Sequence, residues 1–206
     1  AKVAFIGRSD ATAFANDLAE KYDNPPLFIQ GDITDTGALR SSMAQAKDTH
    51  GPITCLINNA ANDARHSTAD VTEDFWDQMV KINLKAYFFA CQTALPQMQA
   101  AGFGSIINFS SISYMMGNAG YPIYTACNSA INGMTRSLAR EFGPDKIRVN
   151  ALAPGWVLTQ KQKDLWVTEE GLAAHVARQC LNETLEPEDI VGGCLFLASQ
   201  SSKMMT

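Results

Sequence analysis

Short apolar runs alternate along this chain with longer segments whose apolar residues recur at helical spacing. The runs are rich in β-branched or aromatic residues and nearly continuous, a pattern typical of parallel strands buried on both faces. We therefore expect strands at Val3–Ile6, Leu27–Ile29, Ile53–Ile57, Ile106–Phe109 and Ile147–Leu152. Such an alternation predicts an α/β fold, in which helices cover a parallel sheet.

The first two helix candidates carry their apolar residues four positions apart. We expect Phe14, Leu18 and Tyr22 to face the core in the first, and Leu39 and Met43 in the second. Further helices are expected at about 72–99, 121–142 and 187–198. Only 154–166 lacks a clear period, which predicts a long loop over a ligand. Because no linker or repeat interrupts the pattern, residues 1–206 are expected to form a single domain.

Composition and charge exclude several classes of function. The 206 residues, 46% of them hydrophobic, are enough for a globular core. A net charge of −5 without a basic block argues against nucleic acid as a partner. No apolar run reaches the roughly 20 residues of a membrane span and no secretory signal is evident, so we expect a cytoplasmic protein without a membrane partner. The five cysteines form no C-x-x-C pair and the three histidines lack metal-ligand spacing, so we expect no disulfide and no metal site.

Small and amide-bearing residues follow directly after each predicted strand. They are Gly7-Arg8-Ser9, Gly31-Asp32-Ile33-Thr34, Asn58-Asn59-Ala60-Ala61, Ser110-Ser111 and Pro154-Gly155-Trp156-Val157. In open α/β sheets the ligand lies beyond the carboxyl ends of the strands. Small residues there allow the backbone to approach a flat ligand such as a dinucleotide.

Tyr124 follows Ser111 by thirteen positions and lies at the start of a predicted helix. The motifs in order are Asp32-Ile33, Asn-Asn-Ala-Ala at 58–61, Asn83, Ser111, Tyr124 and Pro154-Gly155. This set resembles that of the short-chain dehydrogenases/reductases, and the match covers nearly the whole chain. The resemblance implies a doubly wound, Rossmann-type fold, an NAD(P)-dependent oxidoreductase activity and assembly as a homo-oligomer, commonly a tetramer.

The resemblance also implies roles for four catalytic positions. Tyr124 would be the general base, Ser111 would hold the substrate oxygen, and Asn83 would kink its helix and hold a water for proton relay. In the family a lysine four residues after the tyrosine lowers the pKa of the phenol and reaches the nicotinamide ribose. This chain has Asn128 there, whose amide can hydrogen-bond a ribose hydroxyl but carries no charge.

Cofactor binding is implied for a larger set of positions. They are Arg8, Asp32, Ile33, Asn58, Asn59, Ala60, Tyr124, Asn128, Pro154, Gly155, Val157 and Thr159. An acidic residue after the first strand of this chain would favour NAD, whereas Arg8 favours the 2′-phosphate of NADP, so the expectation leans towards NADP. The structural alternatives are that Arg8 is a solvated turn residue and that Asp32 caps a turn.

A narrower resemblance concerns the substrate. Residues 62–66, Ser-Ile-Ser at 111–113, Gly-Tyr-Pro at 120–122 and 160–166 are similar to enzymes that oxidise aldoses at C1, such as xylose, arabinose or galactose 1-dehydrogenases. Their polar groups and aromatic face suit a polyhydroxyl substrate. Substrate binding is implied for Asn62, Arg65, His66, Ser111, Tyr124, Gln160 and Trp166. The structural alternative for residues 62–66 is a charged loop that is exposed to solvent and binds no substrate.

Two other functions stay open at this point. One is a 3-oxoacyl-carrier-protein reductase or another carbonyl reductase on the same scaffold. The other is a catalytically silent dinucleotide-binding subunit, because Asn128 replaces the lysine. The family begins with a strand and a glycine-rich turn, and no such turn precedes Lys2. We therefore expect about 30 further residues in front of this chain and a final strand after it.

Overall fold

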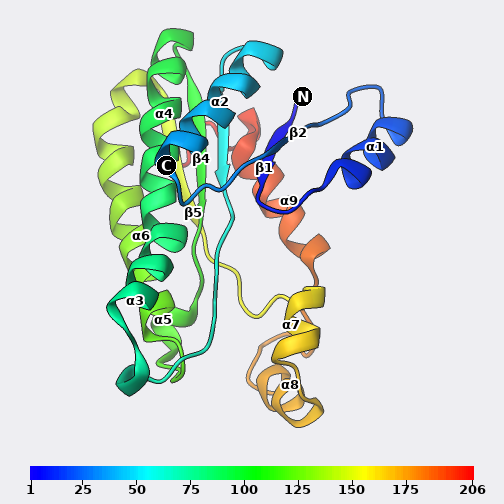
Figure 1. Cartoon of the computed structure of the whole chain (residues 1–206), viewed down its shortest axis with the longest axis vertical. Helices are drawn as coiled ribbons and strands as arrows, with labels where there is room; N and C mark the ends of the chain where they lie inside the picture. Colours follow the sequence, from blue (N-terminus) through cyan, green and yellow to red (C-terminus); the bar gives the residue numbers. More distant parts are fainter.

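The computed structural model describes residues 1–206 as five parallel strands surrounded by helices (Figure 1). The strands are β1 (Ala4–Gly7), β2 (Leu27–Gln30), β3 (Cys55–Asn58), β4 (Gly104–Phe109) and β5 (Ile147–Leu152). The α-helices are α1 (Thr12–Lys21), α2 (Thr36–His50), α3 (Glu73–Val80), α4 (Ala86–Ala101), α5 (Ser113–Met116), α6 (Pro122–Phe142), α7 (Gln160–Leu165), α8 (Glu169–Val176) and α9 (Pro187–Ala198). The predicted strands and the α/β class are confirmed.

The strands form two separate parallel sheets. One contains β1 and β2, and the other has the order β3-β4-β5. Helices α4 and α6 cover one face of the three-stranded sheet, and α9 lies on the other face (Figure 1). The main core lies between β4, β5, α2 and α4. The predicted face of α2 is confirmed, because Leu39 and Met43 are buried there with Met98 and Ile106. No helix combines the length and apolar composition needed to cross a bilayer.

The predicted core face of α1 is wrong for two of its three residues, and the third, Leu18, is half-buried. Phe14 and Tyr22 are 58% and 64% exposed, and Ala15 is the buried residue of this helix. The helix flanks the small two-stranded sheet, which offers little surface to cover. Phe14 makes only an edge contact with Phe5 at 6.1 Å between ring centroids.

The segment 154–166, expected to be one long loop, contains a helix. Helix α7 begins after Thr159, whose hydroxyl accepts a hydrogen bond from the Gln162 N–H. Helix α8, which was not predicted, begins in the same way after Thr168. Both helices are short, so they contain too few turns to show a hydrophobic period. Their starts depend on these two caps.

Gly104 gives a test of packing between β4 and α4. A Cβ added at Gly104 would lie 2.5 Å from the Sδ of Met98, which is fully buried. We expect Gly104→Ala to lower the free energy of unfolding by about 1–3 kcal/mol in urea titrations, because Met98 must move. Gly133→Ala is the matched control. It adds its methyl group to open space within α6 and is expected to raise that free energy by about 0.5–1 kcal/mol. Equal effects of the two changes would contradict this account of the packing.

Candidate active site

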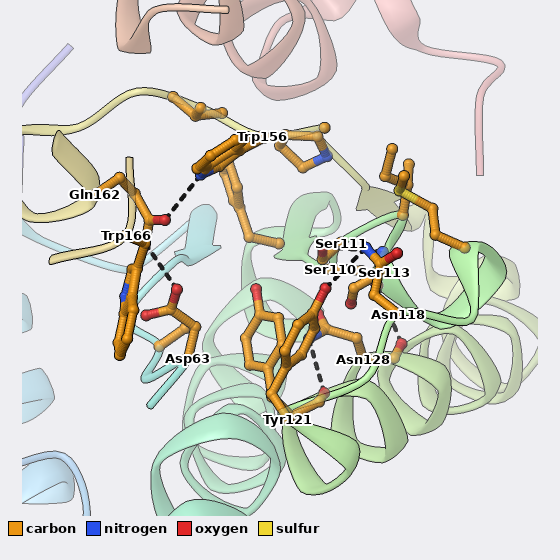
Figure 2. Close-up of a pocket in the computed structure, with 18 of the residues that line it drawn as sticks. Asp63, Ser110, Ser111, Ser113, Asn118, Tyr121, Asn128, Trp156, Gln162 and Trp166 are labelled. Carbon is orange, nitrogen blue, oxygen red and sulfur yellow. Dashed lines mark hydrogen bonds between the residues drawn. The ribbon is translucent and has the colours of Figure 1, made fainter. Parts of the chain in front are cut away.

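A cavity of about 740 Å³, lined by both polar and apolar side chains, lies beyond the carboxyl ends of β4 and β5 (Figure 2). One wall is formed by the residues after β4 and by the first turns of α6. The opposite wall comes from the segment between β5 and α8, which includes Trp156. Parallel strands bring these loops together because all their carboxyl ends meet at one edge. The cavity is therefore where this fold concentrates polar side chains from distant parts of the sequence.

Ser111 and Tyr124 both line this cavity, although they come from different elements. Burial raises the pKa of the Tyr124 phenol above its usual value. Hydrogen bonds from Ser111 and Asn128 lower it, while the nearby Asp63 and Tyr121 raise it further, and the net shift is upward. The phenol, which lines the cavity, is therefore protonated at neutral pH.

Asn128 lies one helical turn after Tyr124 and is 3% exposed. Its Nδ2 donates to the main-chain carbonyl oxygen of Tyr124 at 2.9 Å, and the main-chain carbonyl oxygen of Asn128 accepts from the Ser110 hydroxyl at 3.0 Å. The groups that shift the pKa of Tyr124 include no cation. Asn128 thus supplies a hydrogen bond to the tyrosine but no charge.

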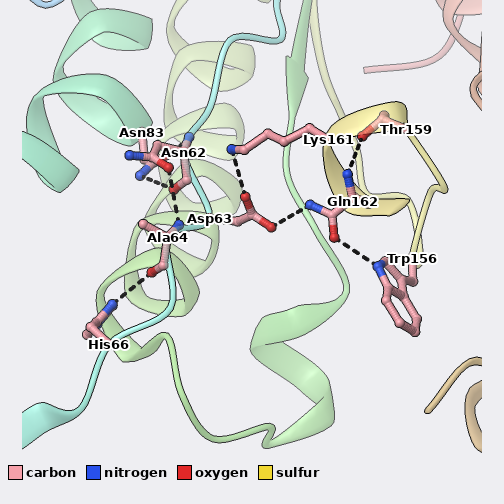
Figure 3. A network of polar contacts seen from close by, with 9 residues as sticks. All are labelled: Asn62, Asp63, Ala64, His66, Asn83, Trp156, Thr159, Lys161 and Gln162. Carbon is pink, nitrogen blue, oxygen red and sulfur yellow. Dashed lines mark hydrogen bonds and ion pairs between the residues drawn. The ribbon is translucent and has the colours of Figure 1, made fainter. Parts of the chain in front are cut away.

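Asn83 lies in a π-helical turn, Lys81–Lys85, between α3 and α4. Its Oδ1 accepts from the Asn62 N–H at 2.8 Å, and its Nδ2 donates to the carbonyl oxygens of Asn62 and Met79, both at 2.9 Å (Figure 3). The structure thus interrupts the expected helix 72–99 at this residue. The amide ties the loop after β3 to the interrupted helix at the edge of the cavity.

A chain of hydrogen bonds crosses the cavity from the loop after β3 to α7 (Figure 3). Asp63 Oδ2 accepts from Gln162 Nε2 at 2.7 Å, and Gln162 Oε1 accepts from Trp156 Nε1 at 2.9 Å. Lys161 Nζ lies 3.1 Å from Asp63 Oδ1. Burial acts to raise the pKa of Asp63, but the hydrogen bonds and the Lys161 charge outweigh it and hold the pKa below its usual value. This carboxylate is therefore ionised at neutral pH.

The sequence analysis assigned no role to Asp63, Gln162, Trp156 or Lys161, which form this hydrogen-bond network. Asp63 and Gln162 are 99 positions apart, so no local spacing signals their contact. Asp63 lies in the loop after β3 and Gln162 in helix α7, and only the fold brings these two segments together.

The structure separates the residues expected to bind substrate into two groups. Ser111, Tyr124, Arg65 and Trp166 line the cavity. The guanidinium carbon of Arg65 lies 3.9 Å from the centre of the Tyr121 ring.

Asn62, His66 and Gln160 do not line the cavity, contrary to the expectation. The Asn62 Oδ1 accepts from the Ala64 N–H at 3.2 Å, and the Nδ1 of His66 lies 2.9 Å from the Ala64 carbonyl oxygen. Gln160 is exposed and bonded to Asp164 at 2.7 Å. In each case the polar side chain contacts a residue two or four positions away in the sequence.

Comparison with known proteins agrees with the geometry of the site. A family model described as enoyl-(acyl carrier protein) reductase matches residues 1–206. The chain belongs to the short-chain dehydrogenase/reductase family. It is 43% identical over 208 residues to "Probable galactose dehydrogenase GalD" of Rhizobium meliloti (strain 1021), covering 100% of this chain and 81% of that protein. It is 39% identical over 201 residues to the D-xylose 1-dehydrogenase of Caulobacter vibrioides, covering 98% of this chain and 79% of that protein.

The structural comparison leads to the same family. A crystal structure of a candidate short-chain alcohol dehydrogenase from Sinorhizobium meliloti 1021 superimposes with a TM-score of 0.94 at 30% identity, covering 100% of this chain and 82% of that one. The Rossmann-like fold expected from the motifs is therefore confirmed. As a short-chain dehydrogenase/reductase, the protein is an NAD(P)-dependent oxidoreductase.

Several positions that this short-chain dehydrogenase/reductase was expected to use for its cofactor line the cavity. They are Asn59, Tyr124, Asn128, Pro154, Gly155, Val157 and Thr159. Asn58 is buried instead, and its Nδ2 donates to Asn108 Oδ1 at 2.9 Å, so its side chain holds β3 to β4. Ala60 is exposed and does not line the cavity.

The remaining expected cofactor positions lie outside this cavity, beyond the carboxyl ends of β1 and β2. Arg8 is exposed. Asp32 Oδ1 accepts from the N–H and the hydroxyl of Thr34 at 2.9 and 2.7 Å, which lowers the pKa of Asp32, and the charge of Arg8 adds to this effect. Ile33 packs against the core. Asp32 thus also has the turn-capping role that was its structural alternative.

Proposed function

We propose that this chain is an NAD(P)-dependent dehydrogenase that oxidises an aldose at C1 to the lactone. The observation that carries the proposal is that Ser111 and Tyr124 line one cavity, where the Ser111 hydroxyl acts to lower the pKa of the Tyr124 phenol. The names of the two curated relatives support an aldose as the substrate class.

The residues around the reacting carbon have distinct tasks in this proposal. The Ser111 hydroxyl binds the anomeric oxygen of the sugar. Tyr124 removes the proton from the anomeric hydroxyl group. The hydrogen on C1 leaves as hydride, which NAD(P)⁺ accepts when bound. Asn83 holds the loop after β3 in place through the two backbone groups of Asn62. A water at Asn83 for proton relay stays a prediction.

The donor set at the strand ends fits a dinucleotide. Asn59, Pro154 and Thr159 present small or amide-bearing positions at the cavity, next to Tyr124. Such positions leave room for a flat ring and offer backbone and side-chain hydrogen bonds. We propose that they hold the nicotinamide half and that Arg8, Asp32 and Ile33 hold the adenosine half. Among the remaining expected positions, Asn128 would contact the ribose, whereas Asn58 and Ala60 would shape the strand end.

Arg8 decides between the two cofactors in this proposal. We expect NADP to bind more tightly than NAD, because a guanidinium pairs with the 2′-phosphate. Arg8→Ala should weaken NADP binding by about 1.5–3 kcal/mol, roughly 10- to 150-fold in Kd, and leave NAD nearly unchanged. Titration calorimetry with each cofactor measures both values. Equal affinities in the unmodified chain would reject the preference.

We also propose that residues 1–206 form one domain that assembles as a homo-oligomer, expected to be a tetramer, through α4 and α6. An apolar groove between these helices supports this, because Phe88 is 45% exposed there next to Phe89 and Met134. Sedimentation velocity measures the state directly. The cytoplasmic location expected from the sequence stays a prediction.

A screen of aldoses with NAD and NADP tests the proposed function. It should be run on this chain and on Asn128→Lys, with lactone formation as the product assay. Turnover of aldoses by either protein would support the proposal. Activity on a β-ketoacyl thioester and none on aldoses would favour the reductase alternative. Cofactor binding without turnover by both proteins would indicate a silent subunit.

A further inference from the structure

More positively charged than negatively charged side chains line the cavity. Three cationic side chains, those of Arg65, Lys161 and Arg178, face a single carboxylate, that of Asp63. Lys161 is paired with this carboxylate, Nζ to Oδ1, at 3.1 Å. The cavity is therefore left with two uncompensated positive charges, although the whole chain has a net charge of −5.

The two remaining arginines have no polar partner in the protein. Neither Arg65 nor Arg178 forms an ion pair, and neither donates a side-chain hydrogen bond. Both are exposed at the cavity, so their N–H groups are open to a ligand. A guanidinium presents five donors in a planar fork that matches the oxygens of a carboxylate or phosphate.

Arg65 lies one aromatic ring away from the reactive tyrosine. Its guanidinium carbon is 3.9 Å from the centre of the Tyr121 ring and 5.5 Å from that of Trp166. The Tyr121 ring centre is in turn 5.8 Å from that of Tyr124. Stacking on a ring holds a guanidinium by its face and leaves the donors at its edge free. Arg65 and Tyr124 thus lie on either side of the Tyr121 ring, in the same cavity.

We propose that the substrate is an acidic sugar, whose carboxylate or phosphate group is bound by Arg65 and Arg178 while its C1 lies at Ser111 and Tyr124. This inference rests on the proposed aldose dehydrogenase function and narrows its substrate class. A hexuronic acid has the required form, with an anomeric hydroxyl at one end and a carboxylate at the other. A neutral aldose leaves both arginines without a partner.

The test compares three sugars of matched stereochemistry: the uronic acid, its neutral parent aldose and the parent's 6-phosphate. Binding of each is measured by titration calorimetry, without cofactor and with saturating NADPH, which cannot accept a hydride from the sugar, so that the measurement does not depend on turnover. The proteins are the unmodified chain, Arg65→Gln, Arg178→Gln and the control Arg136→Gln. Arg136 is exposed on α6 outside the cavity, so its removal changes the net charge equally.

We expect one or both acidic sugars to bind at least about 10-fold more tightly than the parent aldose. Arg65→Gln and Arg178→Gln should each remove most of this difference, by roughly 10-fold or more, whereas Arg136→Gln should not. Arg65→Lys should restore part of it, since it keeps the charge. The sugar that binds more tightly identifies carboxylate or phosphate as the recognised group, and either result supports the proposal.

Other outcomes would overturn the proposal. Equal binding of acidic and neutral sugars, or a preference that survives both glutamine changes, would show that the arginines do not recognise the substrate. A loss of NADP affinity in Arg65→Gln and Arg178→Gln with the sugar preference unchanged would assign them to the cofactor. Arginine-dependent binding of an acidic sugar without turnover of any aldose, in this chain or in Asn128→Lys, would refute the proposed function and leave the acidic-ligand site intact.

Discussion

Replacing Asn128 with lysine is expected to raise kcat by about 100-fold or more at neutral pH. General-base catalysis contributes roughly 10²- to 10⁴-fold, and a base that stays protonated loses much of this. Burial raises the pKa of Tyr124, and no cation among its neighbours opposes that shift. An ammonium at residue 128 would favour the phenolate and restore the base. Steady-state kinetics on an aldose, with the better cofactor, measure the gain.

The dependence of the rate on pH should also differ between the unmodified chain and Asn128→Lys. A raised pKa means that the phenolate forms only in alkaline solution, so the rate of the unmodified chain should rise as pH increases. In Asn128→Lys the pKa is lowered, and the optimum should move to lower pH. Tyr124→Phe in the Asn128→Lys background should abolish the gain, because it removes the ionising hydroxyl and leaves the ring.

Asn128→Lys is also expected to affect the stability of the protein, which has to be measured alongside the kinetics. Asn128 is buried, and its side chain donates to the Tyr124 carbonyl oxygen at 2.9 Å. Lysine loses this bond, at a cost of about 1 kcal/mol, but its longer chain can extend into the cavity that Asn128 lines. Thermal unfolding should therefore show only a modest loss. If the unmodified chain already turns over an aldose at ordinary enzyme rates at pH 7 and lysine has no effect, another group must stabilise the phenolate.

Ser111→Ala in the Asn128→Lys background is expected to lower kcat by about 100-fold. The hydroxyl is proposed to hold the reacting oxygen, and loss of such a donor in other enzymes costs roughly 10²- to 10³-fold. The Ser111 hydrogen bond also lowers the pKa of Tyr124, so its removal should move the pH optimum upwards. This shift separates the effect on the base from a general loss of structure.

Ser113→Ala is the matched control for Ser111→Ala. Ser113 is buried close by, and its hydroxyl has no hydrogen-bond partner in the protein. Its removal should change kcat by much less than the loss of Ser111 and should leave the pH profile in place. Equal losses from both serines, without a shift in pH optimum, would contradict a specific role for Ser111.

The sequence predicted the elements that rest on local patterns. All five strands contain short runs rich in apolar residues, and such runs can be recognised from the sequence alone, although Ile57 of β3 is 46% exposed in the structure. The placement of Ser111 and Tyr124 in one cavity was also predictable, because one follows β4 and the other lies at the start of α6. Each residue sits at the end of an element that the sequence marks clearly.

The helices that were wrong or missed show where local patterns fail. Phe14 and Tyr22 have helical spacing, but a periodic face is buried only if another element covers it, and α1 flanks only the two-stranded sheet. Helix α7 has six residues, so its start depends on the Thr159 cap rather than on a hydrophobic period.

The sequence by itself determined the strands, the order of the motifs and the absence of a lysine at residue 128. Only the tertiary structure decided which polar side chains face one another. Asp63 meets Lys161 and Gln162, Arg65 stacks on Tyr121, and Asn62, His66 and Gln160 turn away to neighbours in the sequence. The physical reason is that strand formation depends on the burial of adjacent residues, whereas a site at the strand ends depends on loops whose separation in space has no counterpart in their separation along the chain.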